Sequence, residues 1–376
     1  MADAAAGMPI ERVAIVGAGT MGRQIAALVA ASGRPVAVFD AYGPALESAI
    51  PKIREELATL PDAPRYQHHQ FRLRPPADTG AVVGRIRVAA SLADAVDGAD
   101  LVIEAVKEDI GVKREVFAEL DRLTSGTILA TNSSSIPSSQ IAPAVSDPGR
   151  LLNMHHFAPI WFRAMVEIMG CGETRPEVIA AAAAYGRSLG LVVATVRGES
   201  KGFIINRIWR AVKRESLRVV DEGHADPEDV DRLWMLFFGT PTGPFGVMDM
   251  VGLDVVSDIE TSYQQVTEDP TDTPSATLRR MLDAGRLGEK SGQGFYRWEN
   301  GKPVKGTAGA VPAGLADRLV GPYVAEAESA LAGGVVTDAD LVDAGAIFGT
   351  GFAPFRGGPL HFAAARRTEG GQTSKG

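Results

Sequence analysis

The chain has 376 residues, 45% of them hydrophobic, with a formal net charge of −8 and a mean hydropathy of +0.02. These values are typical of a globular protein of two or three domains, and they argue against a nucleic-acid partner and against a membrane span, which needs roughly 18 apolar residues. The single cysteine, Cys171, excludes an intrachain disulfide, and the first residues carry no secretory signal. A single cysteine suits a reducing compartment, so we expect a cytoplasmic protein. No zinc-ligand spacing is present, so we expect no structural metal.

The first 200 residues alternate short apolar, β-rich runs with helical patterns. The expected strands are Arg12–Val16, Pro35–Phe39, Ile86–Ala89, Leu101–Ala105, Thr127–Ala130, Leu151–His155, Met165–Met169 and Leu191–Val196. Helical patterns such as Val112–Leu123 and Pro176–Leu189 lie between several of them. This alternation predicts an α/β domain over residues 1–200 with a parallel, doubly wound sheet of the Rossmann type.

After Gly202 the pattern becomes helical and predicts an all-α region to the end of the chain. Within it, Gly239-Thr-Pro-Thr-Gly-Pro-Phe245 recurs as Gly349-Thr-Gly-Phe-Ala-Pro-Phe355, each after a helix. We therefore expect two repeated helical units, over residues 201–305 and 306–376, that pack on each other within one chain about an approximate two-fold axis. Chance similarity between glycine-rich turns is the alternative. A tail from Thr368 is expected to be disordered, and the protein is expected to be a monomer with this internal symmetry or a homodimer.

The first strand runs into a G-x-G-x-x-G loop that opens a helical pattern. Its residues are Gly17, Ala18, Gly19, Thr20, Met21 and Gly22. The glycines permit a tight turn, close approach of the backbone to a pyrophosphate, and close packing of helix on strand. The second strand ends at Asp40, whose carboxylate can accept hydrogen bonds from ribose hydroxyls and repels a 2′-phosphate. We expect these residues to bind NAD rather than NADP; a glycine turn without a ligand is the alternative.

A histidine and a glutamate follow this dinucleotide-binding half. His155 and Glu167 lie in Asn153-Met-His-His-Phe-Ala-Pro-Ile-Trp-Phe-Arg-Ala-Met-Val-Glu167. An imidazole exchanges the proton of an alcohol near neutral pH, and a carboxylate on its other nitrogen fixes its tautomer and raises its basicity. The pair therefore indicates the acid/base of a dehydrogenase, although His155 could instead be a core histidine at a strand end.

Taken together, these motifs resemble those of the L-3-hydroxyacyl-CoA dehydrogenase family. The resemblance runs from about Arg12 to Phe362 and rests on Gly17–Gly22, Asp100-Leu-Val-Ile-Glu-Ala-Val106, Ala130-Thr-Asn-Ser-Ser-Ser-Ile136, the His155–Glu167 segment, Gly202-Phe-Ile-Ile-Asn-Arg207, Gly243-Pro-Phe245 and Lys290-Ser-Gly-Gln-Gly-Phe-Tyr296. The two helical units resemble the C-terminal part of the multifunctional fatty-acid oxidation enzymes, without their hydratase domain. The resemblance implies an NAD-dependent oxidoreductase of fatty acid metabolism that acts on the 3-hydroxy or 3-oxo position of an acyl thioester.

The resemblance also implies roles for individual residues. It places the catalytic acid/base on His155, four residues before Pro159, and its partner on Glu167. It places the substrate-oxygen contact on Ser134 and the asparagine near the reacting carbon on Asn206. Further cofactor contacts are implied for Glu108, Lys113 and Lys290. Structural roles stay open for several of these: a strand end or turn cap for Ser134, a helix cap for Asn206, and a solvated ion pair for Glu108 and Lys113.

Two features depart from the family pattern. Ala158 stands where the family usually has an asparagine before the proline, and Trp161 and Phe162 replace smaller residues. The CoA-contacting excursion of the family is replaced by Arg65-Tyr-Gln-His-His-Gln-Phe-Arg-Leu-Arg74. Its arginines, Arg65, Arg72 and Arg74, are expected to bind the phosphates of CoA or of a carrier protein; a merely solvated basic surface is the alternative.

Three functions are compatible with these residues. The first is a 3-hydroxyacyl thioester dehydrogenase. The second is a dehydrogenase of a small free hydroxy acid, as the carnitine and gulonate dehydrogenases of the superfamily are. The third is a non-catalytic NAD-binding structural protein, like the related lens crystallin, but the joint presence of His155, Glu167, Ser134 and Asn206 argues against it.

Overall fold

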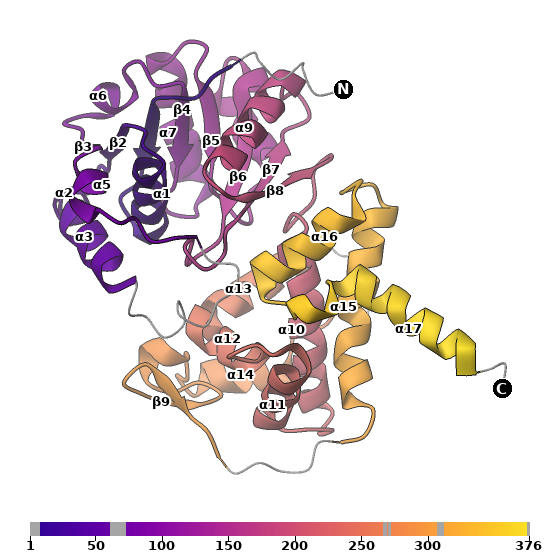
Figure 1. Ribbon diagram of the computed structural model, residues 1–376. Coiled ribbons are helices and arrows are strands. Elements are labelled where there is room, and N and C mark those ends of the chain that lie inside the picture. Colours follow the sequence, from indigo (N-terminus) through magenta and orange to yellow (C-terminus); the bar gives the residue numbers. More distant parts are fainter. Residues whose placement is uncertain (1–7, 61–72, 266–268, 270–271, 307–311, 374–376) are drawn as a thin grey trace. The chain divides into compact units, whose positions relative to one another are not determined.

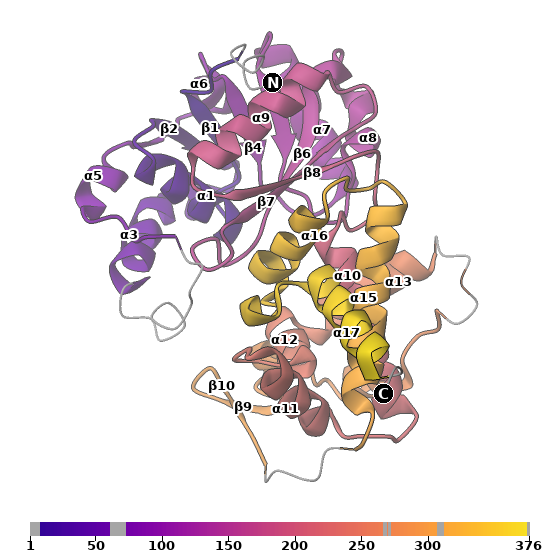
Figure 2. The same cartoon turned by 45° about the vertical axis from the view of Figure 1, so that its right-hand side comes forward.

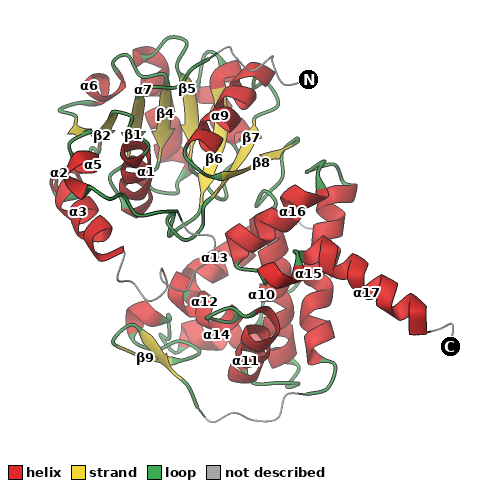
Figure 3. Cartoon of the chain, in the orientation of Figure 1, coloured by secondary structure: helices red, strands yellow, loops and turns green. Residues whose placement is uncertain are grey.

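The computed structural model describes residues 8–60, 73–265, 269, 272–306 and 312–373 (Figure 1). It divides into two compact units: residues 1–205 with 330–349, and residues 206–329 with 350–376. The first, which we call the sheet unit, contains an eight-stranded sheet, and the second, the helical unit, is mainly helical (Figure 3). The chain therefore leaves the sheet unit after Ile205 and returns to it at Ala330.

The sheet has the strand order β3-β2-β1-β4-β5-β6-β7-β8. Its strands are β1 Val13–Val16, β2 Val36–Phe39, β3 Ile86–Val88, β4 Leu101–Glu104, β5 Ile128–Thr131, β6 Leu151–His156, β7 Met165–Gly170 and β8 Val192–Val196. The helices of this unit are α1 Thr20–Ala31, α2 Gly43–Glu47, α3 Ala49–Thr59, α5 Thr79–Val83, α6 Leu92–Val96, α7 Ile110–Leu123, α8 Ser138–Ile141, α9 Pro176–Ser188 and α16 Ala339–Gly345.

Helices cover both faces of the sheet (Figures 1 and 2). Because successive strand residues face opposite sides, β1 contributes Val13 and Ile15 to one core and Ala14 and Val16 to the other. The first core includes side chains of α1, α3, α5 and α9, and the second includes those of α6, α7 and α8. The burial of whole strands explains why they read as continuous apolar runs in the sequence. The Rossmann-type sheet expected from the sequence is confirmed.

One aspect of the expected topology is wrong: the sheet is not entirely parallel. β7 pairs with β6 in the antiparallel sense, and β8 then runs parallel to β7. A parallel neighbour needs a crossover connection, usually a helix, but only a short irregular segment joins β6 to β7. The helix α9 provides that crossover between β7 and β8.

The helical unit has α10 Ile205–Asp221, α11 Pro227–Phe238, α12 Pro244–Val251, α13 Leu253–Gln264, α14 Ala276–Asp283, α15 Leu315–Ala332 and α17 Pro359–Thr373. Two expectations differ here. The region expected to be all-α contains a small hairpin, β9 Arg297–Glu299 with β10 Lys302–Val304, which closes over the turn at Asn300 and Gly301. The tail expected to be disordered continues α17 to Thr373, because the alanines at its start are strong helix formers and favour propagation.

The two stretches expected to form repeated units contact each other inside the helical unit. Tyr323 of α15 lies edge-on to Trp234 of α11, with ring centroids 5.9 Å apart, and stacks on Phe352 at 5.2 Å. Phe352 also lies 4.7 Å from Phe238. Residues 330–349, which lie between these aromatic residues in the chain, belong however to the sheet unit. There α16 packs on the edge strand β8, and the N–H of Arg197 donates to the carbonyl of Val335. The repeat itself and the expected domain boundaries remain predictions.

Candidate active site

The glycine loop lies between β1 and α1. Gly17 has a φ of +111°, and a Cβ there would lie 2.5 Å from the carbonyl oxygen of Ala105. A Cβ on Gly22 would lie 1.8 Å from the carbonyl oxygen of Gly17, whereas a Cβ on Gly19 would meet nothing within 4 Å. Gly17 and Gly22 are thus required by the packing of the loop, and Gly19 leaves open space. Because α1 begins at Thr20 without a side-chain cap, its first N–H groups can face a pyrophosphate, so the loop fits a dinucleotide.

Asp40 follows β2 and lies beside this loop. The N–H of Ala18 donates to its Oδ2 at 2.7 Å, and the N–H of Tyr42 donates to its Oδ1 at 2.8 Å. The carboxylate is therefore oriented by the backbone on both sides. Each oxygen keeps a second lone pair that a ribose hydroxyl could use.

His155 and Glu167 face each other across the antiparallel pair of β6 and β7. They are direct register partners, and Nδ1 of His155 lies 3.0 Å from Oε2 of Glu167. His155 is 6% exposed and Glu167 is fully buried. With Nδ1 held by the carboxylate, Nε2 is the nitrogen that can exchange a proton with a ligand.

The other oxygen of Glu167 is held by the segment that enters α10. The N–H groups of Ile204 and Ile205 donate to Oε1 at 2.9 and 3.0 Å. Just before them, Phe203 has a φ of +56°, which is uncommon for a residue with a side chain. The Phe203 ring lies 5.1 Å from the His155 imidazole. Two backbone N–H donors therefore hold the Glu167 carboxylate in place beside His155.

His156 has a different environment. Its backbone N–H donates to Oδ1 of Asn132 at 2.9 Å, and its Nδ1 lies 3.0 Å from the same oxygen. Complete burial, with a smaller contribution from His155, lowers the pKa of His156 to about 3. His156 is therefore neutral at physiological pH and belongs to the structural core.

Ser134 lies in the turn after β5 and is exposed. Its two neighbours, Ser133 and Ser135, both donate from their hydroxyls to Oε1 of Glu108, the second at 2.8 Å. Lys113 Nζ lies 3.2 Å from Oε2 of the same glutamate. Burial raises the pKa of Glu108, but the charge of Lys113 and the serine hydrogen bonds outweigh it and hold the pKa below its ordinary value.

The remaining expected site residues are distributed differently. Asn206 and Lys290 belong to the helical unit. There Lys290 Nζ lies 2.5 and 2.6 Å from the two carboxylate oxygens of Asp254. Arg74 is exposed, and Arg65 and Arg72 lie outside the described residues.

Sequence reasoning assigned no role to Glu104, although this residue lies at the centre of the hydrogen bonds behind the Ser134 turn. Its signal was visible: an acidic residue ends the otherwise apolar strand Leu-Val-Ile-Glu at the carboxyl edge of the sheet. A fully buried carboxylate is rare unless it is paired.

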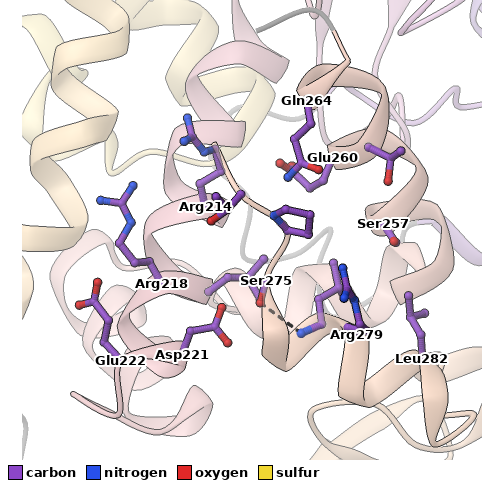
Figure 4. Close-up of a pocket in the computed structure, with 15 residues that line it drawn as sticks. Arg214, Arg218, Asp221, Glu222, Ser257, Glu260, Gln264, Ser275, Arg279 and Leu282 are labelled. Atoms are coloured by element: carbon purple, nitrogen blue, oxygen red, sulfur yellow. Dashed lines mark hydrogen bonds between the residues drawn. The ribbon is translucent and has the colours of Figure 1, made fainter. Parts of the chain in front are cut away.

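A pocket of about 560 Å³ lies within the helical unit, between α10, α13 and α14 (Figure 4). Its walls carry charges of both signs, including Arg214, Arg279 and Glu222. Glu260, which also lines it, pairs with Arg210 at 3.0 Å and with the buried Lys213 at 3.3 Å. None of the residues expected at the active site lines this pocket.

Comparison with known proteins agrees with this fold. Residues 12–199 match the family model described as 3-hydroxyacyl-CoA dehydrogenase, NAD binding domain, and residues 202–298 match the C-terminal domain of the same family. A probable 3-hydroxyacyl-CoA dehydrogenase of Caenorhabditis elegans is 34% identical over 77% of this chain and 93% of its own length. The fatty acid oxidation complex subunit alpha of Shewanella baltica is 31% identical over 96% of this chain, which spans 52% of that subunit.

Among solved structures, the 3-hydroxybutyryl-CoA dehydrogenase of Escherichia coli superposes with a TM-score of 0.80 at 25% identity, covering 95% of this chain and 92% of the other. A glycine loop with an acid after the second strand, placed before a buried His–Glu pair, defines a nicotinamide-dependent oxidoreductase. The chain belongs to the 3-hydroxyacyl-CoA dehydrogenase family, and NAD is its cofactor. Among the described residues, no helix has the length and apolar content needed to cross a membrane.

Proposed function

We propose that the chain interconverts 3-hydroxyacyl and 3-oxoacyl thioesters of CoA, with His155 as general base and acid. The observation that carries the proposal is the His155–Glu167 pair, at 3.0 Å between Nδ1 and Oε2. In the oxidative direction Nε2 of His155 takes the proton of the 3-hydroxyl group. The carboxylate of Glu167 stabilises the imidazolium that results.

The other residues of the proposed site bind and orient. Bound NAD supplies the hydride acceptor for the oxidation. The loop Gly17–Gly22 holds its pyrophosphate, and Asp40 holds its adenine-side ribose. Glu108, Lys113 and Lys290 contact the cofactor or hold residues that contact it. Ser134 and Asn206 are proposed to donate hydrogen bonds to the substrate oxygen as its charge develops. In reduction the proton returns from His155 to that oxygen.

The proposal is tested by following NADH consumption with acetoacetyl-CoA and, separately, with free acetoacetate. We expect turnover with the thioester and little with the free acid. Activity confined to acetoacetate would favour a dehydrogenase of small hydroxy acids, and NADH binding without turnover of either compound would favour a structural protein. Adding acetoacetyl-pantetheine tests whether the CoA nucleotide is needed or another thioester carrier suffices. The cytoplasmic location and the oligomeric state remain predictions.

A further inference from the structure

Glu104 is a buried carboxylate that the proposed mechanism does not use. It ends β4 and is fully buried. Oε1 accepts hydrogen bonds from the N–H of Val106 at 2.6 Å and from Nζ of Lys113 at 2.8 Å. Oε2 accepts from Nζ of Lys113 at 3.0 Å and from the hydroxyl of Thr131 at 2.7 Å. A buried carboxylate is costly unless its oxygens are paired in this way, so the position is strongly constrained.

The ammonium group of Lys113 is buried between two glutamates. The side chain is 1% exposed, and Nζ contacts both oxygens of Glu104 and one oxygen of Glu108. One positive charge therefore lies between two carboxylates, only one of which is buried. Of these two carboxylates, Glu104 makes two contacts with the ammonium group and Glu108 makes one, so Glu104 fixes the Nζ that Glu108 meets.

Glu108 transmits this arrangement to the turn that carries Ser134. Its Oε1 accepts from the hydroxyls of Ser133 and Ser135 and from the backbone N–H of Ser135 at 3.1 Å. The turn is thereby fixed on both sides of Ser134 by one carboxylate. Thr131, the last residue of β5, bonds to Glu104 and also accepts from the N–H of Ser133 at 3.2 Å, which closes a ring of contacts behind the turn.

We propose that Glu104 is a positioning residue of the active site, which fixes the Ser133–Ser135 turn through Lys113 and Glu108 and so places the Ser134 hydroxyl. This inference rests on the function proposed above. Glu104 touches neither substrate nor cofactor in this scheme. Its effect on the reaction passes through Ser134, whereas a residue that only stabilises the fold would act independently of Ser134.

The test is a double-mutant cycle on kcat/KM for acetoacetyl-CoA, with Glu104→Gln, Ser134→Ala and the double variant. We expect each single change to lower kcat/KM by about 10-fold or more, and the double variant to lie within about 2-fold of Ser134→Ala, because coupled residues are not additive. Losses that multiply in the double variant would overturn the inference, as would a Ser134→Ala enzyme with wild-type kcat/KM.

A second pair of variants keeps the test decisive if Glu104→Gln does not fold. Thr131→Val removes two contacts of the ring behind the turn, the hydrogen bond to Glu104 and the one accepted from the N–H of Ser133, while keeping the shape of the side chain. Thr127→Val is the matched control, since Thr127 is also buried in this region and donates instead to the carbonyl of Ala99 at 2.9 Å. We expect Thr131→Val to lower kcat/KM in the wild type but not in Ser134→Ala. Any effect of Thr127→Val on kcat/KM should be the same in both backgrounds. If the two threonine variants behave alike in this comparison, the inference is overturned. If the wild-type protein does not turn over acetoacetyl-CoA, the proposed function fails first, independently of this result.

Discussion

His155 and His156 are neighbours on β6, but their side chains point to opposite faces of the sheet and have different partners. His155 faces a carboxylate that can support its charge, and His156 faces the amide oxygen of Asn132. The proposed acid/base and a core residue are therefore separated by one position along a strand. The selection of His155 from its distance to Pro159 remains a prediction.

Substituting each of the two histidines in turn tests the assignment of His155 as the acid/base. His155→Ala should lower kcat for acetoacetyl-CoA reduction by about 100-fold or more, because general acid–base catalysis contributes at least that factor. His156→Ala removes no charge at pH 7 and should lower kcat much less. Glu167→Gln should also lower kcat, because it removes the charge that supports imidazolium. Steady-state kinetics check all three, and a larger loss in His156→Ala would show that the assignment through Pro159 is wrong.

A second prediction at the residue scale concerns Asp40 and the choice between NAD and NADP. The wild-type enzyme should prefer NAD to NADP by about 2 kcal/mol or more in kcat/KM, roughly 30-fold, because the carboxylate repels a 2′-phosphate. Asp40→Asn retains an acceptor for the N–H of Ala18 but removes the charge, so it should reduce the preference with little change in stability. Asp40→Ala should in addition weaken the binding of both cofactors. Equal efficiency of the wild-type enzyme with NAD and NADP would contradict the role given to Asp40.

At the scale of elements, Asp231 joins α11 to the start of α12. Its carboxylate accepts from the N–H groups of Phe245 and Gly246 at 2.7 and 2.8 Å and from the hydroxyl of Tyr296 at 2.9 Å. Burial raises the pKa of Asp231 to about 7, although these hydrogen bonds act in the opposite direction. The contact explains why Gly243-Pro-Phe245 stands at the beginning of a helix: the first N–H groups of α12 meet a carboxylate.

The raised pKa predicts a pH dependence of stability. An unfolded aspartate has a pKa near 3.9, so between about pH 4 and pH 7 the unfolded chain releases a proton that the folded chain keeps. The contribution of Asp231 is therefore complete below pH 4 and is lost as the pH rises to about 7. The free energy of unfolding of the wild type, relative to Asp231→Asn, should be larger at pH 5 than at pH 8 by about 2–3 kcal/mol.

Denaturant unfolding at the two pH values checks this prediction. Asp317→Asn is the control, because Asp317 forms an exposed ion pair with Arg366. Its effect should stay within about 0.5 kcal/mol at both pH values. A pH-independent difference between wild type and Asp231→Asn would contradict the role of burial.

The sequence predicted most elements of the sheet unit to within a residue or two, because buried parallel strands are continuous apolar runs. It did not predict the direction of β7, since strand direction depends on the connection and not on the strand residues. The hairpin of β9 and β10 has strands of only three residues, too short for a periodic signal. Within the candidate site, motif spacing predicted the pairing of His155 with Glu167, and their side chains are in contact. The contact of Glu104 with Thr131 joins two strands and can be seen only after the sheet has formed.

At the scale of the whole molecule, the net negative charge of the protein repels its proposed substrate, which is also negatively charged. CoA carries several phosphate charges, and a protein of net charge −8 must meet them with a local basic surface. The sequence offers Arg65, Arg72 and Arg74 between the second and third strands, of which Arg74 is described and exposed. Arginine binds phosphate with charge-assisted hydrogen bonds, each contributing about 1.5–3 kcal/mol.

Neutralising these three arginines with glutamine should raise the KM for acetoacetyl-CoA, more at low salt than at high salt, and leave kcat nearly unchanged. The KM for acetoacetyl-pantetheine, which lacks the nucleotide, should not change. Arg366→Gln with Arg367→Gln in α17 is the control for net charge, since both arginines form exposed ion pairs there. An equal loss with both substrates would show that the cluster supports the fold rather than the nucleotide.

The return of residues 330–349 to the sheet unit also determines when that unit can be completed during synthesis. Edge strand β8 is covered by α16, and Gly345 and Gly349 pack so closely on Ile205 that a Cβ on either would lie less than 3 Å from its side chain. A nascent chain that has reached only residue 205 therefore has all eight strands but an uncovered edge. The helical residues 206–329 must emerge from the ribosome before this edge is covered. For the same reason, a single proteolytic cut among those residues would leave the sheet unit in two pieces held together by contacts alone.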